Sequence, residues 1–175
     1  MLYAAYGSNL HPLRLGRRTP SATLLGTATI AGWELYFDKR GQDGSGKCTI
    51  RATGGSLCCA IYDICPADKA KLDAIEGVGK GYARSTLRVP GFGLCATYVA
   101  DKGYRDASIL PFCWYKDLVL NGALALGFES DYVGRIAAVA ARTDPDRRRL
   151  ARNRRLAALL AVAPRWKPDR TRLLD

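Results

Sequence analysis

The sequence predicts an α+β fold in which a small mixed, antiparallel-rich β-sheet curls into a partial barrel flanked by helices. Two patterns predict this class: strand-like segments with β-branched and aromatic residues are concentrated before residue 100, and helical patterns dominate afterwards. A chain of 175 residues, 48% of them apolar, is sufficient for one domain with a sizeable core. No internal repeat is evident.

The strands are expected in the first hundred residues, between turns rich in glycine. Gly32 separates two of them, the pair Gly54-Gly55 predicts a turn, and the polar, glycine-rich residues 39–46 predict a mobile loop. The expected strands are residues 1–6, 22–30, 33–38, 47–53, 57–64, 81–89 and 94–100, with a hairpin-like connection at 90–93 between the last two.

The clearest helix signal is at residues 66–76, where Pro66 suits the first helical position and Gly77 suits the C-terminal stop. The sequence Asp144-Pro145-Asp146 provides a cap, a proline and an acidic residue, and is a strong helix start. The other expected helices are residues 11–18, 111–126, 131–142 and, after that start, a segment ending at about 162.

The basic charge of the chain is concentrated at its C-terminal end. Residues 147–175 contain ten Lys or Arg and two Asp, and so carry +8 of the net charge of +11. We therefore expect a domain at residues 1–142 followed by a basic helical extension at 143–175.

Two interpretations of this extension remain open. Leu150, Ala157, Leu160 and Ala161 could form one apolar stripe that docks on the domain and leaves the arginines in solvent. The alternative is binding of nucleic acid or another anionic surface. The arginines are not interleaved with aromatic residues, Trp166 being alone there, which argues against nucleic acid.

The first ten residues carry the most distinctive chemistry. A short apolar and aromatic strand runs into Gly7-Ser8-Asn9, and a helix start follows. Gly7 lets a ligand approach the backbone, and Ser8 and Asn9 are both preferred helix N-caps. This order predicts a concavity of backbone N–H groups that binds carboxylate or phosphate, although a simple capped turn would have the same local sequence.

Glu76 is the second candidate, because it ends the helix predicted at residues 66–76. A helix C-terminus disfavours negative charge, and the apolar neighbours Ile75 and Val78 should desolvate the carboxylate. Both effects raise the pKa above its reference of about 4.3, which suits a general base near neutral pH. The alternative is a solvated surface glutamate.

The chain lacks the motifs of several common enzyme classes. It has one histidine, His11, no Gly-x-Ser-x-Gly elbow, no Walker loop and no dinucleotide fingerprint. Its six cysteines form no Cys-x-x-Cys pair, so we expect no metal and no cofactor, and reduced thiols in a cytoplasmic protein. No apolar run is long enough to cross a bilayer and no signal peptide is visible, so no membrane partner is expected.

Three short motifs in this order resemble those of the γ-glutamylcyclotransferases. Residues 2–10 (LYAAYGSNL) resemble the signature loop, and residues 72–78 (LDAIEGV) with Gly81-Tyr82 resemble the segment of the catalytic glutamate. Tyr115-Lys116, followed by residues 121–123 and Gly127, resembles the helix that supplies a substrate-contacting tyrosine. The resemblance covers about residues 1–142 and also touches residues 19–22.

The resemblance implies an enzyme that cyclises a small-molecule γ-glutamyl amine or amino acid to 5-oxoproline and releases the free amine, as in glutathione metabolism. A non-catalytic anion or nucleic-acid binding module and a related γ-glutamyl hydrolase or acyltransferase remain alternatives, and the protein could be a monomer or a homodimer. Carried onto this chain, the resemblance makes Glu76 the base. It implies substrate binding by Tyr3, Ala4, Ala5, Tyr6, Gly7, Ser8, Asn9, Tyr82 and Tyr115.

Overall fold

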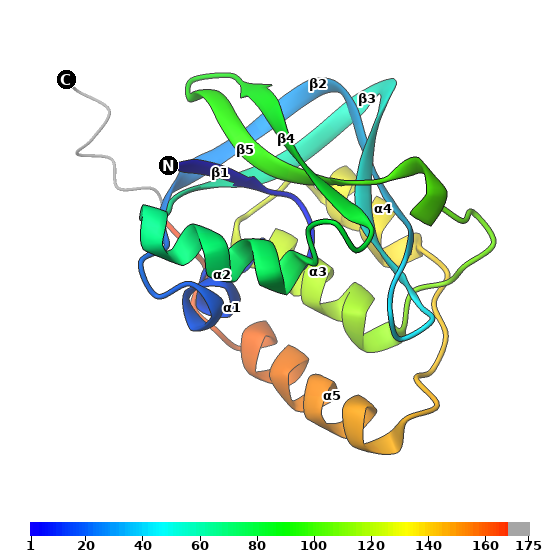
Figure 1. Ribbon diagram of the computed structural model, residues 1–175. Coiled ribbons are helices and arrows are strands. Elements are labelled where there is room, and N and C mark those ends of the chain that lie inside the picture. The colour runs from blue at the N-terminus through cyan, green and yellow to red at the C-terminus, as the bar shows by residue number, and fades with distance from the viewer. Residues whose placement is uncertain (168–175) are drawn as a thin grey trace.

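A five-stranded mixed sheet, shown in Figure 1, organises the protein, and the computed structural model describes residues 1–167. The strand order is β2-β3-β1-β5-β4. Strand β1 is antiparallel to β3 and parallel to β5, and the other neighbouring pairs are antiparallel. The strands are β1 (Leu2–Ala5), β2 (Thr23–Arg40), β3 (Gly46–Asp63), β4 (Tyr82–Val89) and β5 (Gly93–Ala100).

The sheet is strongly curled but remains open. Its hydrogen-bonded order ends at β2 and β4, so these strands are edges and the barrel is not closed. The Phe92 ring in the β4–β5 turn nevertheless lies against Gly26 of β2, where an added Cβ would be 3.0 Å from the ring. The α+β class with an antiparallel-rich sheet is therefore confirmed, in the form of a partial barrel.

Strands β2 and β3 form one long hairpin, which the sequence predicted as four shorter strands. The predicted interruptions at Gly32 and at Gly54-Gly55 are irregularities within continuous strands: the register changes from Ala31↔Ser56 to Trp33↔Ala52 across them. The predicted turn at Gly54-Gly55 is therefore wrong. The predicted loop at residues 39–46 is also shorter, because β2 continues to Arg40 and β3 begins at Gly46.

The helices follow the sequence prediction closely. They are α1 (Pro12–Arg18), α2 (Pro66–Glu76), α3 (Cys113–Ala125), α4 (Ser130–Ala138) and α5 (Arg147–Ala161), with a 3-10 turn at Lys102–Tyr104. Helix α4 ends before the predicted residue 142, because the backbone of Arg142 instead pairs with Pro111 and Cys113. No helix among residues 1–167 is long and apolar enough to span a bilayer.

Helix α5 packs on α3 through its apolar stripe and lies at the bottom of the molecule in Figure 1. The helix start predicted at residues 144–146 is confirmed, but the cap is Asp146 and not Asp144: the Asp146 side chain accepts a hydrogen bond from the Arg149 amide at 2.9 Å. Ala157 and Leu160 are buried and Leu150 is partly buried, whereas Ala161 is exposed.

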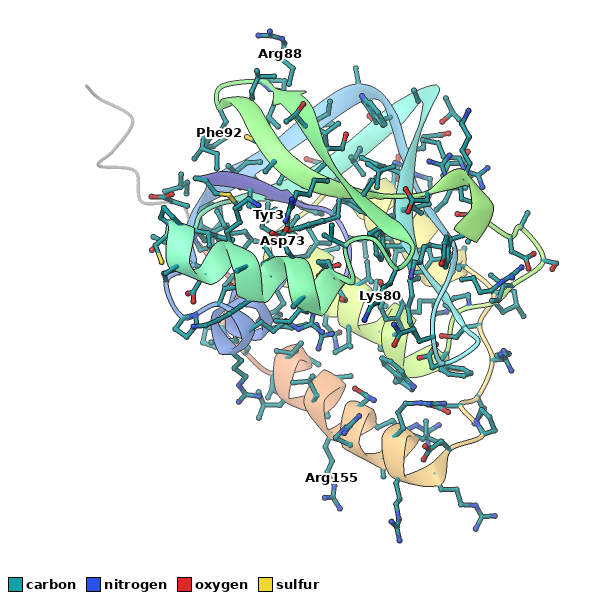
Figure 2. All side chains as sticks on the ribbon, viewed as in Figure 1. Tyr3, Asp73, Lys80, Arg88, Phe92 and Arg155 are labelled. Atoms are coloured by element: carbon teal, nitrogen blue, oxygen red, sulfur yellow. The ribbon has the colours of Figure 1, made fainter. Side chains whose placement is uncertain are left out.

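The arginines of α5 lie mostly on the opposite side. Figure 2 shows Arg155 projecting away from the body of the molecule. Binding of nucleic acid or an anionic surface by these side chains stays a prediction, as does the division of the chain after residue 142. Residues 168–175 of the predicted extension lie outside the described residues.

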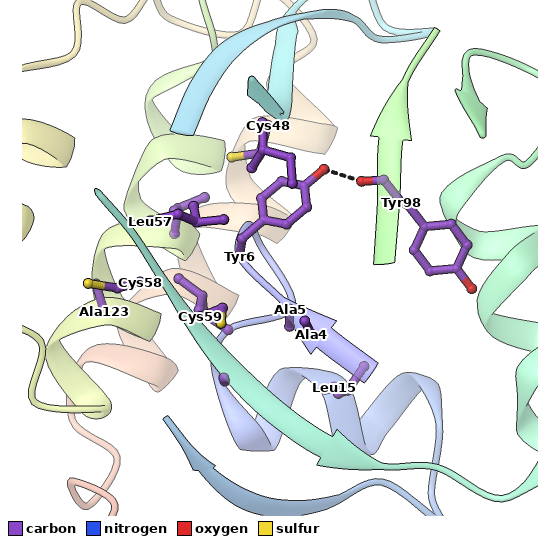
Figure 3. Packing of buried hydrophobic residues seen from close by; sticks show 14 of the residues in the cluster. Ala4, Ala5, Tyr6, Leu15, Cys48, Leu57, Cys58, Cys59, Tyr98 and Ala123 are labelled. Atoms are coloured by element: carbon purple, nitrogen blue, oxygen red, sulfur yellow. Dashed lines mark hydrogen bonds between the residues drawn. The ribbon is translucent and has the colours of Figure 1, made fainter. Parts of the chain in front are cut away.

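The core lies between the sheet and the helices, and it contains four of the six cysteines, which are all free thiols. Figure 3 shows three of the four, Cys48, Cys58 and Cys59, packed with Leu57 and Tyr6. These cysteines act as small apolar residues, as their positions in strand-like segments predicted.

Candidate functional site

The loop between β1 and α1 is built differently from the capped turn that the sequence predicted. The Leu10 amide donates to the Gly7 carbonyl at 2.9 Å, so Ser8 and Asn9 lie at the tip of a tight turn. The N-cap of α1 is His11, whose Nδ1 accepts a hydrogen bond from the Leu13 amide at 3.2 Å. The prediction that Ser8 or Asn9 caps the helix is therefore wrong.

Position 7 has no room for a side chain, so a glycine is required there. A Cβ at this position would lie 2.8 Å from the Cβ of Cys48 on β3, and its backbone does not adopt a positive φ. The loop therefore packs directly against the hairpin. The amides of Gly7, Ser8 and Asn9 have no acceptor among residues 1–167, so they are free to bind a ligand.

Glu76 is the last residue of α2, and its carboxylate points to the same loop. Gly77 follows in the left-handed conformation, with φ of 70°, and ends the helix. Asn9 Nδ2 donates a hydrogen bond to Glu76 Oε1 at 2.7 Å, and Arg18 Nη1 lies 3.6 Å from the same oxygen. Arg18 also donates to Asn9 Oδ1 at 2.9 Å. The loop and the C-terminal end of α2 thus form one polar site.

Burial raises the pKa of Glu76 above its ordinary value, while the Arg18 charge and the Asn9 hydrogen bond act in the opposite direction. The side chain is 18% exposed, so it is not the solvated glutamate that the sequence also allowed. The expected cause was only partly right, because Ile75 is itself exposed. Five tyrosine side chains line the cavity that Glu76 shares.

Five tyrosines line this cavity: Tyr3, Tyr6, Tyr82, Tyr98 and Tyr115. Burial is the first cause that raises the pKa of each phenol, so all five are neutral at physiological pH.

Most of these hydroxyls are used to hold the walls of the cavity. Tyr6 donates to the carbonyl of Tyr98, as Figure 3 shows, and Tyr82 donates to the carbonyl of Cys48 at 2.5 Å. Tyr115 Oη accepts from the Cys48 amide at 3.1 Å. Tyr3 Oη accepts from Asn9 at 3.2 Å and has no acceptor for its own proton among residues 1–167. Tyr3 is therefore a hydrogen-bond donor available to a ligand.

Asp73, one turn before Glu76, fixes α2 to the sheet. Its carboxylate accepts two hydrogen bonds from Arg84 on β4, at 3.0 and 2.7 Å, and one from the Tyr98 hydroxyl on β5 at 2.8 Å. These bonds, with Lys69, hold the pKa of Asp73 far below its usual range. Figure 2 shows Tyr3 and Asp73 between the sheet and α2. Asp73 therefore positions the helix end that carries Glu76.

The structure brings together most of the residues that the sequence singled out. One cavity is lined by Tyr3, Tyr6, Gly7, Ser8, Asn9, Glu76, Tyr82 and Tyr115, together with Cys48 and Tyr98. Ala4 and Ala5 do not line it: both are fully buried and pair with Ile61 and Ala60 of β3, so their inclusion in the loop is corrected.

The sequence analysis missed three residues of the site. Tyr98 could have been found as a tyrosine in a predicted strand, but Cys48 looked like a core residue and Arg18 like a solvated helix end. Among residues 1–167, no group of three or more histidine, cysteine or acidic side chains could hold a metal ion.

Comparisons with known proteins bear on the family and the fold. The family model described as gamma-glutamyl cyclotransferase, AIG2-like, matches residues 3–116. No curated protein is a sequence match to this chain.

Solved structures share the fold. The crystal structure of an uncharacterised protein from Homo sapiens is 27% identical, with a TM-score of 0.72 over 81% of this chain and 88% of that one. A structure named gamma-glutamyl cyclotransferase is 23% identical, with a TM-score of 0.77 over 91% and 98% of the two chains. YkqA from Bacillus subtilis is 19% identical, with a TM-score of 0.68 over 81% of this chain and 55% of its own. At identities under 25%, the last two likenesses show the fold alone.

Proposed function

The chain belongs to the gamma-glutamyl cyclotransferase, AIG2-like family, and from this premise we propose that it cyclises γ-glutamyl amines or amino acids to 5-oxoproline. One observation carries the proposal. A partly buried carboxylate with a raised pKa, Glu76, shares a polar cavity with the loop at Gly7, Ser8 and Asn9, whose three backbone amides have no acceptor among residues 1–167. The chemistry of this reaction needs a base and hydrogen-bond donors, and no more.

In the proposed reaction, the substrate supplies its own nucleophile. Its α-amino group attacks its γ-carbonyl carbon, and a proton of the amine passes to the carboxylate of Glu76. A C–N bond forms and closes the five-membered ring, and the negative charge on the former carbonyl oxygen is stabilised by N–H and O–H donors. The amide C–N bond then breaks, and the proton held by Glu76 passes to the departing amine. Glu76 is thereby restored as a carboxylate.

The loop amides and the Tyr3 hydroxyl are the groups proposed to hold the substrate. Holding the amine against the carbonyl converts two reactants into one, which is worth up to roughly 7–11 kcal/mol in the best cases. Tyr6, Tyr82 and Tyr115 line the cavity beside the carboxylate.

An enzyme nucleophile is not part of this proposal. Burial raises the pKa of the Cys48 thiol to about 12, so this cysteine in the cavity wall stays protonated. Within residues 1–167, the one hydrogen bond of Ser8 Oγ is from Arg14 Nη2, at 3.4 Å, and His11 uses its Nδ1 to cap α1. Neither arrangement activates a hydroxyl by a general base.

The test is turnover of a panel of γ-glutamyl amino acids, γ-glutamyl amines and glutathione by the full chain, with 5-oxoproline, free glutamate and the released amine all measured. We expect 5-oxoproline from at least one member. Release of glutamate in its place would favour the hydrolase alternative, and no product from any member would overturn the proposal.

The Glu76→Gln variant tests the base. Glutamine keeps the oxygen that accepts from Asn9 but cannot take a proton, so turnover should fall by about 10²-fold or more. Glu129→Gln, at an exposed position before α4, is the matched control and should behave as the native protein. Near-native turnover by a folded Glu76→Gln protein would sink the assignment.

A further inference from the structure

A second cavity adjoins the site at Glu76, which lines both cavities. This outer cavity is lined by Lys39, Asp43, Lys47, Glu76 and Lys80, with intervening loop and helix residues. Glu76 is shared with the cavity described above, so its side chain stands at the boundary between the two. Figure 2 shows Lys80 on the loop that joins α2 to β4.

The three lysines of the outer cavity differ in how their charge is matched. Lys47 Nζ donates to Asp43 Oδ2 and to Ser45 Oγ, both at 2.7 Å. Lys80 is exposed to solvent. Lys39 is only 5% exposed, yet no carboxylate of residues 1–167 lies within 4 Å of its ammonium group. Lys39 is therefore a largely covered side chain whose ammonium group lines the cavity and lacks an acidic partner among residues 1–167.

Aromatic packing fixes the Lys39 side chain in place. Its Nζ lies 4.6 Å from the centroid of the Tyr82 ring and 5.8 Å from that of Tyr104. Gly81, at φ of 110°, leaves space for the Lys39 side chain, because a Cβ at position 81 would lie 2.9 Å from Lys39 Cε. The ammonium group is thus held beside Tyr82, which also lines the cavity of the loop.

An ammonium group without an acidic partner attracts an anionic group, and the partial covering of Lys39 strengthens this attraction because solvent screens it less. Burial and the neighbouring Lys47 lower the pKa of Lys39, while Glu76, Asp43 and Asp101 raise it from a longer distance. Asp43 is already paired with Lys47, so it does not neutralise Lys39. The outer cavity therefore offers a preformed site for an anionic group of a ligand.

The place of this site relative to the proposed reaction indicates which part of a substrate it receives. If the γ-glutamyl group lies among the loop amides, with its amine near Glu76, the departing amine has to extend past Glu76. The outer cavity is the space that opens there.

We propose that Lys39 binds an anionic group on the leaving amine and makes the protein selective for γ-glutamyl substrates whose leaving amine carries a carboxylate. This inference rests on the proposed function, since it assigns a part of the same substrate. Lys39 is a specificity-determining residue in this role and takes no part in proton transfer.

The test compares γ-glutamyl-alanine with γ-glutamyl-alaninamide, which differ in the leaving amine by a carboxylate against a neutral amide. For the native protein, kcat/KM should be about tenfold or more higher for γ-glutamyl-alanine than for γ-glutamyl-alaninamide, because one charge-assisted hydrogen bond contributes about that much. In Lys39→Met this ratio should fall to near one. Lys80→Met, which removes an exposed lysine of the same cavity, should change the ratio by less than about threefold.

Two further measurements keep the outcome decisive. Lys39→Gln should also lose the preference and guards against misfolding of the methionine variant. Calorimetry on the inactive Glu76→Gln protein, with and without Lys39→Met, measures the ratio of the binding affinities for the two compounds, which does not depend on turnover. If no panel member gives 5-oxoproline, the proposed function fails, and this binding ratio still tests Lys39.

The results that would overturn the inference are distinct from failure of the proposed function. Equal turnover of the two compounds by the native protein would overturn the inference about Lys39 and leave the proposed cyclisation intact. An equal loss for both compounds in Lys39→Met would do so as well, because it would make Lys39 a structural residue or a contact of the γ-glutamyl half.

Discussion

Replacing Asn9 with leucine should make Glu76 a carboxylate that is harder to ionise. Asn9 Nδ2 donates to Glu76 Oε1 at 2.7 Å, and Asn9 Oδ1 accepts from Arg18 at 2.9 Å. Leucine has a similar size but offers neither donor nor acceptor. A donor that binds the charged form lowers a carboxylate pKa, so its loss should raise the pKa of Glu76 further.

The size of the effect follows from the bond that is lost. A hydrogen bond to a charged group contributes about 1.5–3 kcal/mol, and one pKa unit corresponds to about 1.36 kcal/mol. Because the proposed reaction uses the ionised form of Glu76, the acid limb of the kcat/KM profile against pH should move to higher pH by about one to two units.

The chain makes this prediction directly measurable. It contains only three glutamates, Glu34, Glu76 and Glu129, so a sample labelled with ¹³C at the glutamate carboxyl gives three resonances to titrate. Loss of one resonance in Glu76→Gln assigns the signal. The titration reports the carboxylate itself, and the kcat/KM profile against pH reports its use in turnover.

Asn121→Leu is the matched control. Asn121 Nδ2 donates to the Ala157 carbonyl at 2.9 Å, between α3 and α5, so this variant should lose stability without moving the titration of Glu76. A folded Asn9→Leu protein in which both the resonance and the acid limb titrate as in the native protein would refute the claim that Asn9 tunes Glu76.

Two further substitutions test the roles of the loop serine and of the last helix. Ser8→Ala should keep turnover within about tenfold of native and lower the free energy of unfolding by under about 1 kcal/mol. The hydrogen bond that Ser8 accepts from Arg14 is long, and Ser8 caps no helix. A covalent γ-glutamyl adduct on Ser8 in mass spectrometry would contradict the mechanism. Leu160→Ala should cost about 2–5 kcal/mol in denaturant unfolding, because Leu160 is 1% exposed where α5 packs on α3; an unchanged midpoint would mean that α5 is not part of the folded unit.

The order and type of the elements could be predicted from the sequence because local signals determine them. Pro66 and Gly77 bound α2 as their backbone preferences require, and α5 starts directly after the predicted segment 144–146, although its cap is Asp146 and not Asp144. Gly54-Gly55 has an equally strong local turn signal, yet β3 runs through it, because pairing with β2 on both sides holds the strand together.

The site was predictable to the extent that it is local. Glu76 stands at a helix end and Gly7 to Asn9 form a turn, both of which can be read from neighbouring residues. Other residues of the site come from elsewhere: Arg18, which lowers the pKa of the carboxylate, reaches it from the end of α1, and Tyr98, which lines the cavity, lies on β5. Such contacts depend on how α1 and α2 pack against the sheet, which the sequence pattern does not specify.

A base in this cavity has to satisfy two opposing requirements. It must be desolvated sufficiently for its pKa to rise, and it must still ionise near neutral pH. The tyrosine walls meet the first requirement, and Arg18 with Asn9 limits the shift that they cause. Asn9 belongs to the same turn whose amides are proposed to hold the substrate. If these amides hold the substrate as proposed, a ligand that shifts Asn9 away from the carboxylate also raises the pKa of Glu76, so that binding and basicity are coupled through this turn.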